Sequence, residues 1–376
     1  MIRILEVNSK ETKRAFASYS NKLYQNNPYY VPDLVFEQMR FFDSKYNPAF
    51  EFCISRQYLA YDDQKRRYVG RVGAIINHKS NRKWNQKYVR FTCFDFEDDI
   101  DISSRLIEAV SNWAKEQGMD ALHGPLGFTD LDHQGMLVEG FDELDLYITF
   151  YNAPYYAKHM EALGFMKDVD WIECQLRLDG AKAERLSKIA EHVANRSSFK
   201  LVDFHNKKDI LPWAKQVFEL YNRAYAPLYG MTDLSESQID AYIKSFFGFV
   251  NPDFIKVVVD SANKLAGFSI AMPSLSKAMQ LSRGNLFPFG FLPILRAIKH
   301  SEVLDLYLIA VAPEYQNSGI NALMLNSVMS TARRYGMTHA ETGPMLEENH
   351  KVQAQWKFFD VRQHRRRRVY VKKIDN

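Results

Sequence analysis

Cysteine is scarce in this sequence, and its spacing argues against two common kinds of site. The chain holds three cysteines, Cys53, Cys93 and Cys174, which are far apart and form no Cys-x-x-Cys pair. Structural zinc sites and disulfide frameworks require several cysteines at short, regular spacings. The sequence therefore predicts no metal site and no disulfide framework, and it favours a reducing compartment.

Long hydrophobic runs and a large charge imbalance are also missing. No stretch reaches the ~18 consecutive apolar residues of a spanning helix, and the first residues lack the apolar core of a signal peptide. The formal net charge is only +4 over 376 residues, which gives no general electrostatic case for nucleic acid. With 46% hydrophobic and 25% charged residues, we expect a cytoplasmic globular protein of two or three domains, without a transmembrane segment.

What the sequence does contain is a strand, a turn and a helix between Asp305 and Asn326. An apolar run ends at Val311 and is stopped by a proline, and apolar residues recur at helical spacing from Ile320 onward. A polar turn with a glycine at the start of a helix offers free backbone N–H groups, which suit a phosphate or pyrophosphate. The turn has neither the lysine of a GxxxxGK[ST] loop nor the three glycines of a dinucleotide fold.

The pattern Val-Ala-Pro-Glu-Tyr-Gln-x-x-Gly-Ile, which ends this strand and forms the turn, resembles motif A of the GCN5-related N-acetyltransferases (GNAT). In that superfamily the amides of Gln/Arg-x-x-Gly-x-Gly/Ala hold the pyrophosphate of coenzyme A. The resemblance implies an α/β (α+β) fold with a mixed central sheet flanked by helices. It also implies acetyl-CoA or another acyl-CoA as cofactor and no metal. The implied coenzyme residues are Ile309, Ala310, Val311, Gln316, Asn317, Ser318, Gly319, Ile320 and Asn321, the last of which departs from the family pattern.

The two halves of the chain resemble each other weakly. An amphipathic helix, a Gly-Met pair, a strand and a Gly-Pro pair follow one another up to Pro125, and the same order recurs up to Pro344. Hairpin patterns precede both copies. We therefore expect tandem GNAT-like lobes at 1–179 and 200–376, joined by a charged helical linker at 180–199.

The repeat supplies an internal comparison for the turn. Residues 98–103 stand at the place of 316–321 in the first half, contain no glycine, and carry Asp98, Asp99 and Asp101. Carboxylates at a helix N-terminus satisfy the dipole themselves and repel a pyrophosphate, whether or not they are ordinary capping residues. We expect the first lobe to be degenerate and without a coenzyme site, and the second lobe to bind the acyl-CoA.

Acyl transfer from a thioester to an amine needs aligned reactants, a proton acceptor and a donor to the developing oxyanion. The resemblance implies that the strand before the turn pairs with the pantetheine arm, with the backbone N–H of Val311 as the oxyanion donor. Glu341 is the candidate general base, because it lies on the next strand and a clefted glutamate can have its pKa raised. The plain alternative is a solvated or salt-bridged Glu341. His339, on the same strand face, reads as structural.

A second motif departs from the family. The segment 347–359 is expected to be a helix and resembles motif B, in which an asparagine is often followed seven positions later by a tyrosine that protonates the leaving thiolate. Asn349 fits the first position, but the second is Trp356, whose indole N–H is not a proton-transfer acid. Either Tyr370, Tyr315 or a water serves as the acid, or the thiolate leaves unaided, or the protein binds acyl-CoA without efficient transfer. Asn349 and Trp356 are counted with the coenzyme residues.

Aromatic residues suggest an acceptor pocket. Tyr225 and Tyr229 lie where, in GNAT folds, a loop borders the acceptor, and Phe289 and Phe291 belong to an apolar, turn-rich run at 286–295 flanked by lysine and arginine. For that run three interpretations stay open: a lid over the acceptor, a packing element between the halves, or a contact with a membrane surface.

We interpret the chain as an acyl-CoA-dependent N-acyltransferase, with acetyl transfer to a small-molecule or peptide amine as the specific prediction. One alternative is a catalytically weak acyl-CoA or small-molecule binding protein of GNAT descent, which Trp356 and Asn321 favour. The other is a Fem-like aminoacyl-tRNA-dependent ligase, supported only by the basic strand at 364–373. We expect one face of that strand to meet coenzyme phosphates or solvent rather than nucleic acid.

Overall fold

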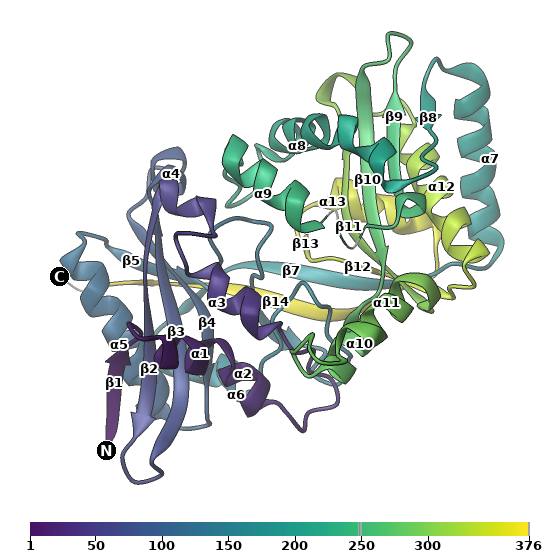
Figure 1. Cartoon of the computed structure of the whole chain (residues 1–376). Helices are drawn as coiled ribbons and strands as arrows, with labels where there is room; N and C mark the ends of the chain where they lie inside the picture. The colour runs from purple at the N-terminus through teal and green to yellow at the C-terminus, as the bar shows by residue number, and fades with distance from the viewer. Residues whose placement is uncertain (247, 249, 375–376) are drawn as a thin grey trace. The chain divides into compact units, whose positions relative to one another are not determined.

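The computed structural model describes residues 1–246, 248 and 250–374, which form two compact units. The first unit comprises Met1–Trp171, Ser276–Pro293 and the residues from Arg365 onward, and the second comprises Ile172–Leu275 and Ile294–His364. Each unit has a mixed sheet flanked by helices (Figure 1). The expected fold class is therefore confirmed. Among the described residues, no helix combines the length and the apolar character that crossing a bilayer requires.

The sheet of the first unit has the strand order β1-β2-β3-β4-β5-β14, and its β4–β5 pair is parallel. The other neighbours in this order are antiparallel. The strands are β1 (Ile2–Glu6), β2 (Cys53–Asp62), β3 (Arg67–Asn77), β4 (Tyr88–Phe96), β5 (Ala121–Gly124) and β14 (Val361–Lys373), with β6 (Met136–Glu139) paired to β14. The helices are α1 (Lys10–Ala17), α2 (Tyr19–Leu23), α3 (Val35–Phe41), α4 (His78–Lys83), α5 (Ile100–Glu116), α6 (Tyr155–Ala162) and α10 (Ser276–Ser282).

The sheet of the second unit has the order β7-β12-β11-β10-β9-β8, with β11 and β12 parallel and the other neighbours antiparallel. The strands are β7 (Met166–Arg177), β8 (Lys200–Val202), β9 (Ile255–Val259), β10 (Leu265–Pro273), β11 (Val303–Val311), β12 (His339–Thr342) and the short β13 (Met345–Leu346). The helices are α7 (Ala181–Arg196), α8 (Leu211–Tyr225), α9 (Glu236–Phe246), α12 (Ile320–Arg334) and α13 (His350–Gln353). Helix α11 (Phe291–His300) begins in the first unit and continues in the second.

The same strand–helix–strand arrangement occurs once in each unit. Helix α5 connects the parallel strands β4 and β5, and helix α12 connects the parallel strands β11 and β12. Each helix buries an apolar stripe and is followed by a glycine with positive φ, Gly118 at 68° and Gly336 at 74°. A glycine after the last turn accepts the left-handed conformation that ends a helix at little cost. The internal repeat expected from the sequence is thus a tandem repeat of the fold.

The two units do not follow the simple boundaries expected at 1–179, 180–199 and 200–376. Strand β7 leaves the first unit after Trp171 and pairs with β12 of the second, whereas the end of β14 pairs with β5 of the first. An unpaired edge beside β5 would expose a row of backbone N–H and C=O groups, and the last strand of the chain covers it. The expected linker, α7, packs through Leu186 into the same core as Leu325 of α12.

A further expectation, for the segment before β14, is wrong. The segment 347–359 is not one helix, because α13 stops at Gln353 and a 3₁₀ segment, Ala354–Phe358, follows. The tighter 3₁₀ turn places residues three apart on one side, and both Trp356 and Phe359 are buried.

The basic strand buries part of its charge inside the first unit. Arg365 and Arg367 are fully buried and Arg367 forms an ion pair with Asp145, while Arg368 donates from Nε to Asp170 at 2.8 Å. Ion pairing neutralises buried guanidinium groups within the unit. Arg365 and Arg367 therefore do not reach solvent, whereas Arg366, Arg368 and Lys372 are half-buried and Lys373 is exposed. The ion pairs weaken the support for a tRNA-dependent ligase.

Candidate functional site

Strand β11 loses its partner halfway along its length. Its parallel pairing with β12 runs from Val303, opposite His339, to Leu306, opposite Thr342, whereas β11 itself continues to Val311. On its other side the register with β10 slips by one residue, which makes Tyr307 a β-bulge. A bulge bends its strand and increases the twist. The second half of β11 therefore has an edge that no strand of the described chain covers.

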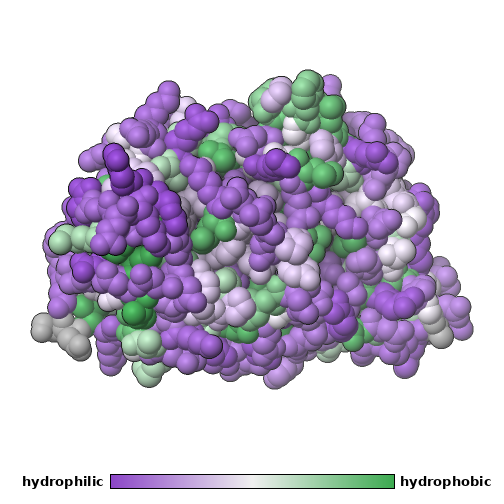
Figure 2. Space-filling view, turned by 90° about the horizontal axis from the view of Figure 1, so that it is seen from below, coloured by the Kyte–Doolittle hydropathy of each residue, from purple (hydrophilic) through white to green (hydrophobic). Residues whose placement is uncertain are grey.

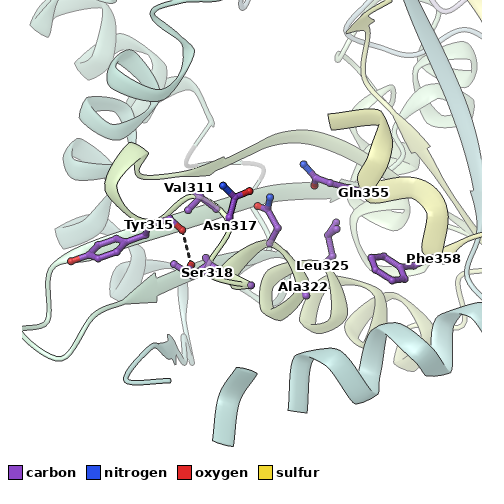
Figure 3. A pocket seen from close by; sticks show the side chains of 11 residues that line it. Val311, Tyr315, Asn317, Ser318, Ala322, Leu325, Gln355 and Phe358 are labelled. Atoms are coloured by element: carbon purple, nitrogen blue, oxygen red, sulfur yellow. Dashed lines mark hydrogen bonds between the residues drawn. The ribbon is translucent and has the colours of Figure 1, made fainter. Parts of the chain in front are cut away.

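A pocket of about 240 Å³ lies where β11 ends and α12 begins (Figure 3). Helix α12 starts at Ile320, its N-cap residue is Gly319, and no side chain caps it. Within the described chain, the backbone N–H groups of Gly319, Ile320 and Asn321 donate to no other backbone group. Open amides at a helix N-terminus are a site for an anion. The lining residues are Val311, Tyr315, Asn317, Ser318, Gly319, Ile320, Asn321, Ala322, Leu325, Gln355 and Phe358.

Local hydrogen bonds hold the turn open. The Ser318 hydroxyl donates to the carbonyl of Tyr315 at 2.6 Å, and the Tyr315 hydroxyl donates to Oδ2 of Asp260 at 2.7 Å. The tyrosine hydrogen bond keeps the pKa of Asp260 below its ordinary value. Asn317 has a φ of 66°, in the left-handed region that asparagine tolerates better than most residues. The turn is thus shaped by its own side chains before any ligand enters.

Gly319 has a structural reason to be glycine. Its φ is 89°, and a Cβ at this position would lie 2.5 Å from Cγ2 of Val193 on α7. Both the backbone conformation and the close approach of α7 exclude a larger residue. A substitution here therefore changes folding as well as any ligand contact, so Gly319 is a poor probe of binding by itself.

The structure brings together six of the residues expected at the coenzyme site: Val311, Asn317, Ser318, Gly319, Ile320 and Asn321 all line the pocket. Gln316 is exposed and does not line it, and Ala310 lies opposite Phe268 of β10. Sequence reasoning missed Gln355 and Phe358, which approach the helix start from the 3₁₀ segment (Figure 3). No local motif marks them, because their place depends on how the segment after α13 turns.

The uncovered edge of β11 carries a tyrosine hydroxyl. Tyr225, at the end of α8, donates from its hydroxyl to the carbonyl of Ile309 at 3.0 Å, and the Ile309 N–H lies 3.4 Å from the same oxygen. Ile309 therefore points its backbone groups away from β10. Because backbone groups alternate along a strand, those of Val311 point the same way. Tyr225 thus lies at the strand edge along which the pantetheine arm was expected, and Tyr229 follows in the part-buried loop beyond α8.

The two motif B residues have structural positions. Asn349 is the N-cap of α13, where its side chain accepts from the N–H of Val352 at 3.3 Å. Trp356 is buried, and its indole N–H lies 3.0 Å from the sulfur of Met345. The indole is therefore directed into the core, and its neighbour Gln355 takes the position on the pocket wall.

Glu341 belongs to a buried polar cluster on the strand face next to the uncovered edge. Its Oε2 lies 2.8 Å from Nε2 of His364, and its Oε1 accepts from Nε2 of Gln175 at 2.9 Å. The β11–β12 register sets buried Asp305 opposite Glu341. Tyr307 lies two residues along from Asp305, and burial together with the Asp305 charge raises its pKa well above the ordinary value. Sequence reasoning missed His364 as a partner, because it comes from β14 and only the tertiary fold brings it here.

Three expected site residues lie in the first unit. Tyr370 is a buried member of the first unit's core, where burial raises the pKa of its phenol. Phe289 is 72% exposed, and Phe291 is half-buried with its ring 6.3 Å from that of Phe287. None of the three lines the pocket of the second unit.

Comparison with known proteins identifies the fold. No family model matches the chain. The chain is 24% identical to Protein YghO of Escherichia coli over 97% of its own length and 94% of that protein. It is 22% identical to the bacterial ceramide synthase of Caulobacter vibrioides over 93% and 91% of the two lengths.

Among solved structures, a tandem GNAT protein from the clavulanic acid biosynthesis pathway superposes over 100% of this chain and 99% of its own, with a TM-score of 0.57 at 13% identity. A GCN5-related glucosamine N-acetyltransferase region of a fungal multi-domain protein matches 99% of this chain and 38% of its own, with a TM-score of 0.58 at 10% identity. These likenesses span the whole chain and concern its fold, which is a tandem arrangement of GNAT units.

Proposed function

We propose that this tandem GNAT-fold protein transfers an acyl group from coenzyme A to an amine, and that the second unit holds the coenzyme. The observation that carries the proposal is the pocket at the uncapped N-terminus of α12, next to the uncovered edge of β11. An anion site and an extended strand edge side by side match the two parts of acyl-CoA, a pyrophosphate and an amide-bearing pantetheine arm.

The pyrophosphate binds the amides of Gly319, Ile320 and Asn321, assisted by the dipole of α12. Asn317 and Gln355, whose side chains line the pocket, donate further hydrogen bonds. The pantetheine amides pair with the backbone of β11 in the manner of an added strand. Because Tyr225 now bonds to Ile309 there, its hydroxyl must leave the strand edge when the arm enters.

The chemistry is direct attack of a neutral amine on the thioester carbonyl. The N–H of Val311 stabilises the oxyanion that develops on that carbonyl. Glu341 accepts the proton of the attacking amine. Gln175 fixes the position of its carboxylate through a hydrogen bond, and His364 lies close to the second oxygen. The carbon–sulfur bond then breaks, the amide forms, and coenzyme A leaves as a thiolate.

A proton for that thiolate comes from Tyr225 or from water. Trp356 is directed toward Met345, and Tyr315 is held by Asp260, so neither is placed to act as the acid. Tyr225 already lies on the β11 edge and can stay close to the sulfur after it is displaced. Tyr225→Phe then lowers the turnover number without weakening coenzyme binding, whereas an unchanged turnover assigns the proton to water.

The acceptor is an amine, and one relative suggests its class. A ceramide is the amide of a long-chain amino alcohol, and the protein named bacterial ceramide synthase matches nearly the full length of this chain. At 22% identity, the similarity guides which substrates to test and does not assign the substrate. The amine panel therefore includes a long-chain amino alcohol beside short amines and peptides, and the acyl panel includes acetyl-CoA and long-chain acyl-CoA.

Thermal unfolding with added ligand tests the coenzyme site first. A ligand at 100 times its Kd stabilises the folded state by about 2.7 kcal/mol, so coenzyme A and acyl-CoA should raise the unfolding temperature. No shift at millimolar ligand would remove both the enzyme and the binding-protein interpretations. Release of free thiol in the presence of the amine panel then separates them, because a catalytically weak binder is stabilised but releases no thiol above background.

A further inference from the structure

The segment from the end of α10 to the start of α11 exposes large apolar side chains to solvent. The exposed fractions are 73% for Leu281, 82% for Phe287, 72% for Phe289 and 51% for Leu292, and we call these four side chains the apolar tip. The face in Figure 2 has hydrophobic side chains gathered in a projection on a surface that is otherwise largely hydrophilic. Clustered apolar exposure of this kind marks an interaction site more often than chance.

The apolar tip is exposed on a firmly held base. Gln280 donates from Nε2 to the carbonyls of Pro28 and Tyr30 at 2.8 and 2.9 Å, and the carbonyl of Gly284 accepts from the N–H of Val35 at 3.1 Å. These anchors all lie in the first unit. Hydrogen bonds to the first unit therefore fix the backbone from which the two phenylalanines project.

The segment that carries the apolar tip has charged residues of one sign only. No aspartate or glutamate occurs between Asp260 and Glu302, whereas Arg283, Arg296 and Lys299 are exposed. Aromatic and leucine side chains edged by lysine and arginine are typical of segments that rest in the interface of an anionic bilayer.

Helix α11 continues the same chemistry. Leu292 and Leu295, the latter 55% exposed, stand one turn apart on the helix, and Arg296 and Lys299 also stand one turn apart. Side chains three apart share a helix surface. An apolar edge next to a basic edge lets the leucines enter the acyl region while the cations stay among the lipid phosphates.

We propose that the apolar tip docks this protein on the surface of an anionic lipid bilayer. Phe287 and Phe289 enter the boundary between head groups and acyl chains, and Arg283, Arg296 and Lys299 contact lipid phosphates. Two copies of the chain pairing through this surface would bring cations of the same sign together, with no carboxylate in the segment to offset them. Of the three interpretations of residues 286–295, the surface contact is the one that these exposures favour.

Flotation of the full-length protein with vesicles tests the proposal. The protein should float with phosphatidylcholine vesicles that contain phosphatidylglycerol, and far less with phosphatidylcholine alone. The double variant Phe287→Ser/Phe289→Ser should reduce the vesicle-bound fraction by at least ~10-fold, because two large apolar side chains no longer leave water. The double variant Arg296→Glu/Lys299→Glu should remove the preference for phosphatidylglycerol and the sensitivity to salt.

Matched controls are available elsewhere on the chain. Met166→Ser removes an apolar side chain that is 65% exposed, and Arg185→Glu/Lys188→Glu reverses two exposed cations at the same spacing on α7. Both should float like the wild type. Asn321→Glu should also float normally, since docking does not depend on the coenzyme site.

Three results would overturn the proposal. The wild type could fail to float with anionic vesicles, or the control variants could lose as much binding as the tip variants. In the third case, sedimentation would reveal a dimer that Phe287→Ser/Phe289→Ser dissociates, which would assign the surface to a second copy. Equal urea midpoints of wild type and variants exclude unfolding as the cause of lost binding.

Discussion

The two units begin their central helix in opposite ways. Asp99 is the N-cap of α5, and its Oδ1 accepts from the N–H of Asp101 at 2.9 Å, whereas Gly319 begins α12 without any side-chain cap. A carboxylate at this place satisfies the amides and the helix dipole from within the chain. The same fold position is therefore closed in the first unit and open in the second.

Neighbouring side chains strengthen the closure of the first unit. His159 on α6 lies with Nε2 3.0 Å from Oδ1 of Asp98 and with Nδ1 2.8 Å from the hydroxyl of Ser103. Three side chains thus bridge the start of α5. Since Ser103 is fully buried, this Ser–His–Asp arrangement acts as a structural tie. The comparison supports the proposal that only the second unit binds coenzyme.

Strand β5, which follows α5, and strand β12, which follows α12, also carry different polar side chains. His123 on β5 lies opposite Arg90 and has Nε2 2.7 Å from Oδ2 of Asp168, whereas Glu341 on β12 lies opposite Asp305. The first unit presents a histidine next to a carboxylate, and the second presents a carboxylate that accepts from Gln175 and lies 2.8 Å from Nε2 of His364. In the second unit, a carboxylate therefore occupies the strand position that a histidine occupies in the first.

The largest expected effect on turnover comes from substituting Glu341 and comparing it with the same substitution at His123. Glu341→Gln should lower the turnover number by about 10²–10⁴-fold, the range for loss of a general base, and should leave stabilisation by coenzyme A intact. His123→Gln should change the turnover number less than about twofold, because it removes no transition-state interaction. Steady-state thiol release and ligand-dependent unfolding measure the two quantities separately. Full activity in Glu341→Gln would place the base elsewhere.

The next effect comes from giving the open turn the acidic character of the closed one. Asn321→Glu should weaken coenzyme A binding by about 100-fold, since a carboxylate close to a pyrophosphate repels it by a few kcal/mol. The same change should slightly raise the stability of the free protein, because an acid in the first turn suits the helix dipole. Calorimetric titration and unfolding without ligand check the two signs.

Ser330→Glu is the matched control for that experiment. It adds the same charge to the same helix, nine residues or ~13 Å farther along, and should leave binding unchanged. If Ser330→Glu weakened binding as much as Asn321→Glu, a general charge effect would replace the specific site.

A smaller effect separates packing from ligand contact at Gly319. Gly319→Ala should destabilise the protein by about 2–3 kcal/mol, from the left-handed φ and from overlap with Val193. The overlap portion should disappear in a Val193→Ala background, which leaves about 1 kcal/mol of backbone strain. Asp99→Ala, the first-unit counterpart, should cost about 1 kcal/mol through loss of a cap. Urea unfolding measures all of these, and an undiminished penalty in the double variant would contradict the packing argument.

The smallest effect concerns pH. Burial lowers the pKa of His123 below its ordinary 6.5, with Asp168 acting in the opposite direction. As the pH falls, His123 is protonated in the unfolded chain before it is protonated in the folded one. The contribution of His123 to the free energy of unfolding is therefore complete above pH 6.5 and decreases as the pH falls below that value. His123→Gln should make the urea midpoint depend less on pH between 7.5 and 5.5. A dependence steeper than in the wild type would mean that Asp168 outweighs burial.

Local patterns predicted the elements that their own residues determine. The hairpin strands β9 and β10, both parts of the repeat, and the strand–turn–helix at Val311 to Ile320 appear where sequence periodicity placed them. The internal alignment was off by two positions, because the N-caps show that Gly319 matches Asp99. Helix starts are set by capping geometry, which apolar periodicity does not locate to the residue.

The sequence did not predict which distant strands and side chains come together. Nothing near His364 indicates that β14 would bring it to Glu341, and the arginines that follow read as a surface patch, although Asp145 and Asp170 neutralise Arg367 and Arg368 inside the fold. The sequence alone does not show whether an arginine is buried or exposed, because the carboxylate that pairs with it comes from another part of the fold. By contrast, the exposed cations near the apolar tip lie in a run between Asp260 and Glu302 that contains no acidic residue.

The exchange of strands sets an order in time as well as in space. The residues of β14 that complete the first unit beside β5 are synthesised some 250 positions after β5 itself. At ~5–20 residues per second, the edge of β5 waits roughly 10–50 s for its partner. The unit that is synthesised first can therefore be completed only after the second unit has been synthesised. A nascent chain stalled before Arg365 contains every strand of the second sheet, whereas its first sheet still lacks most of β14.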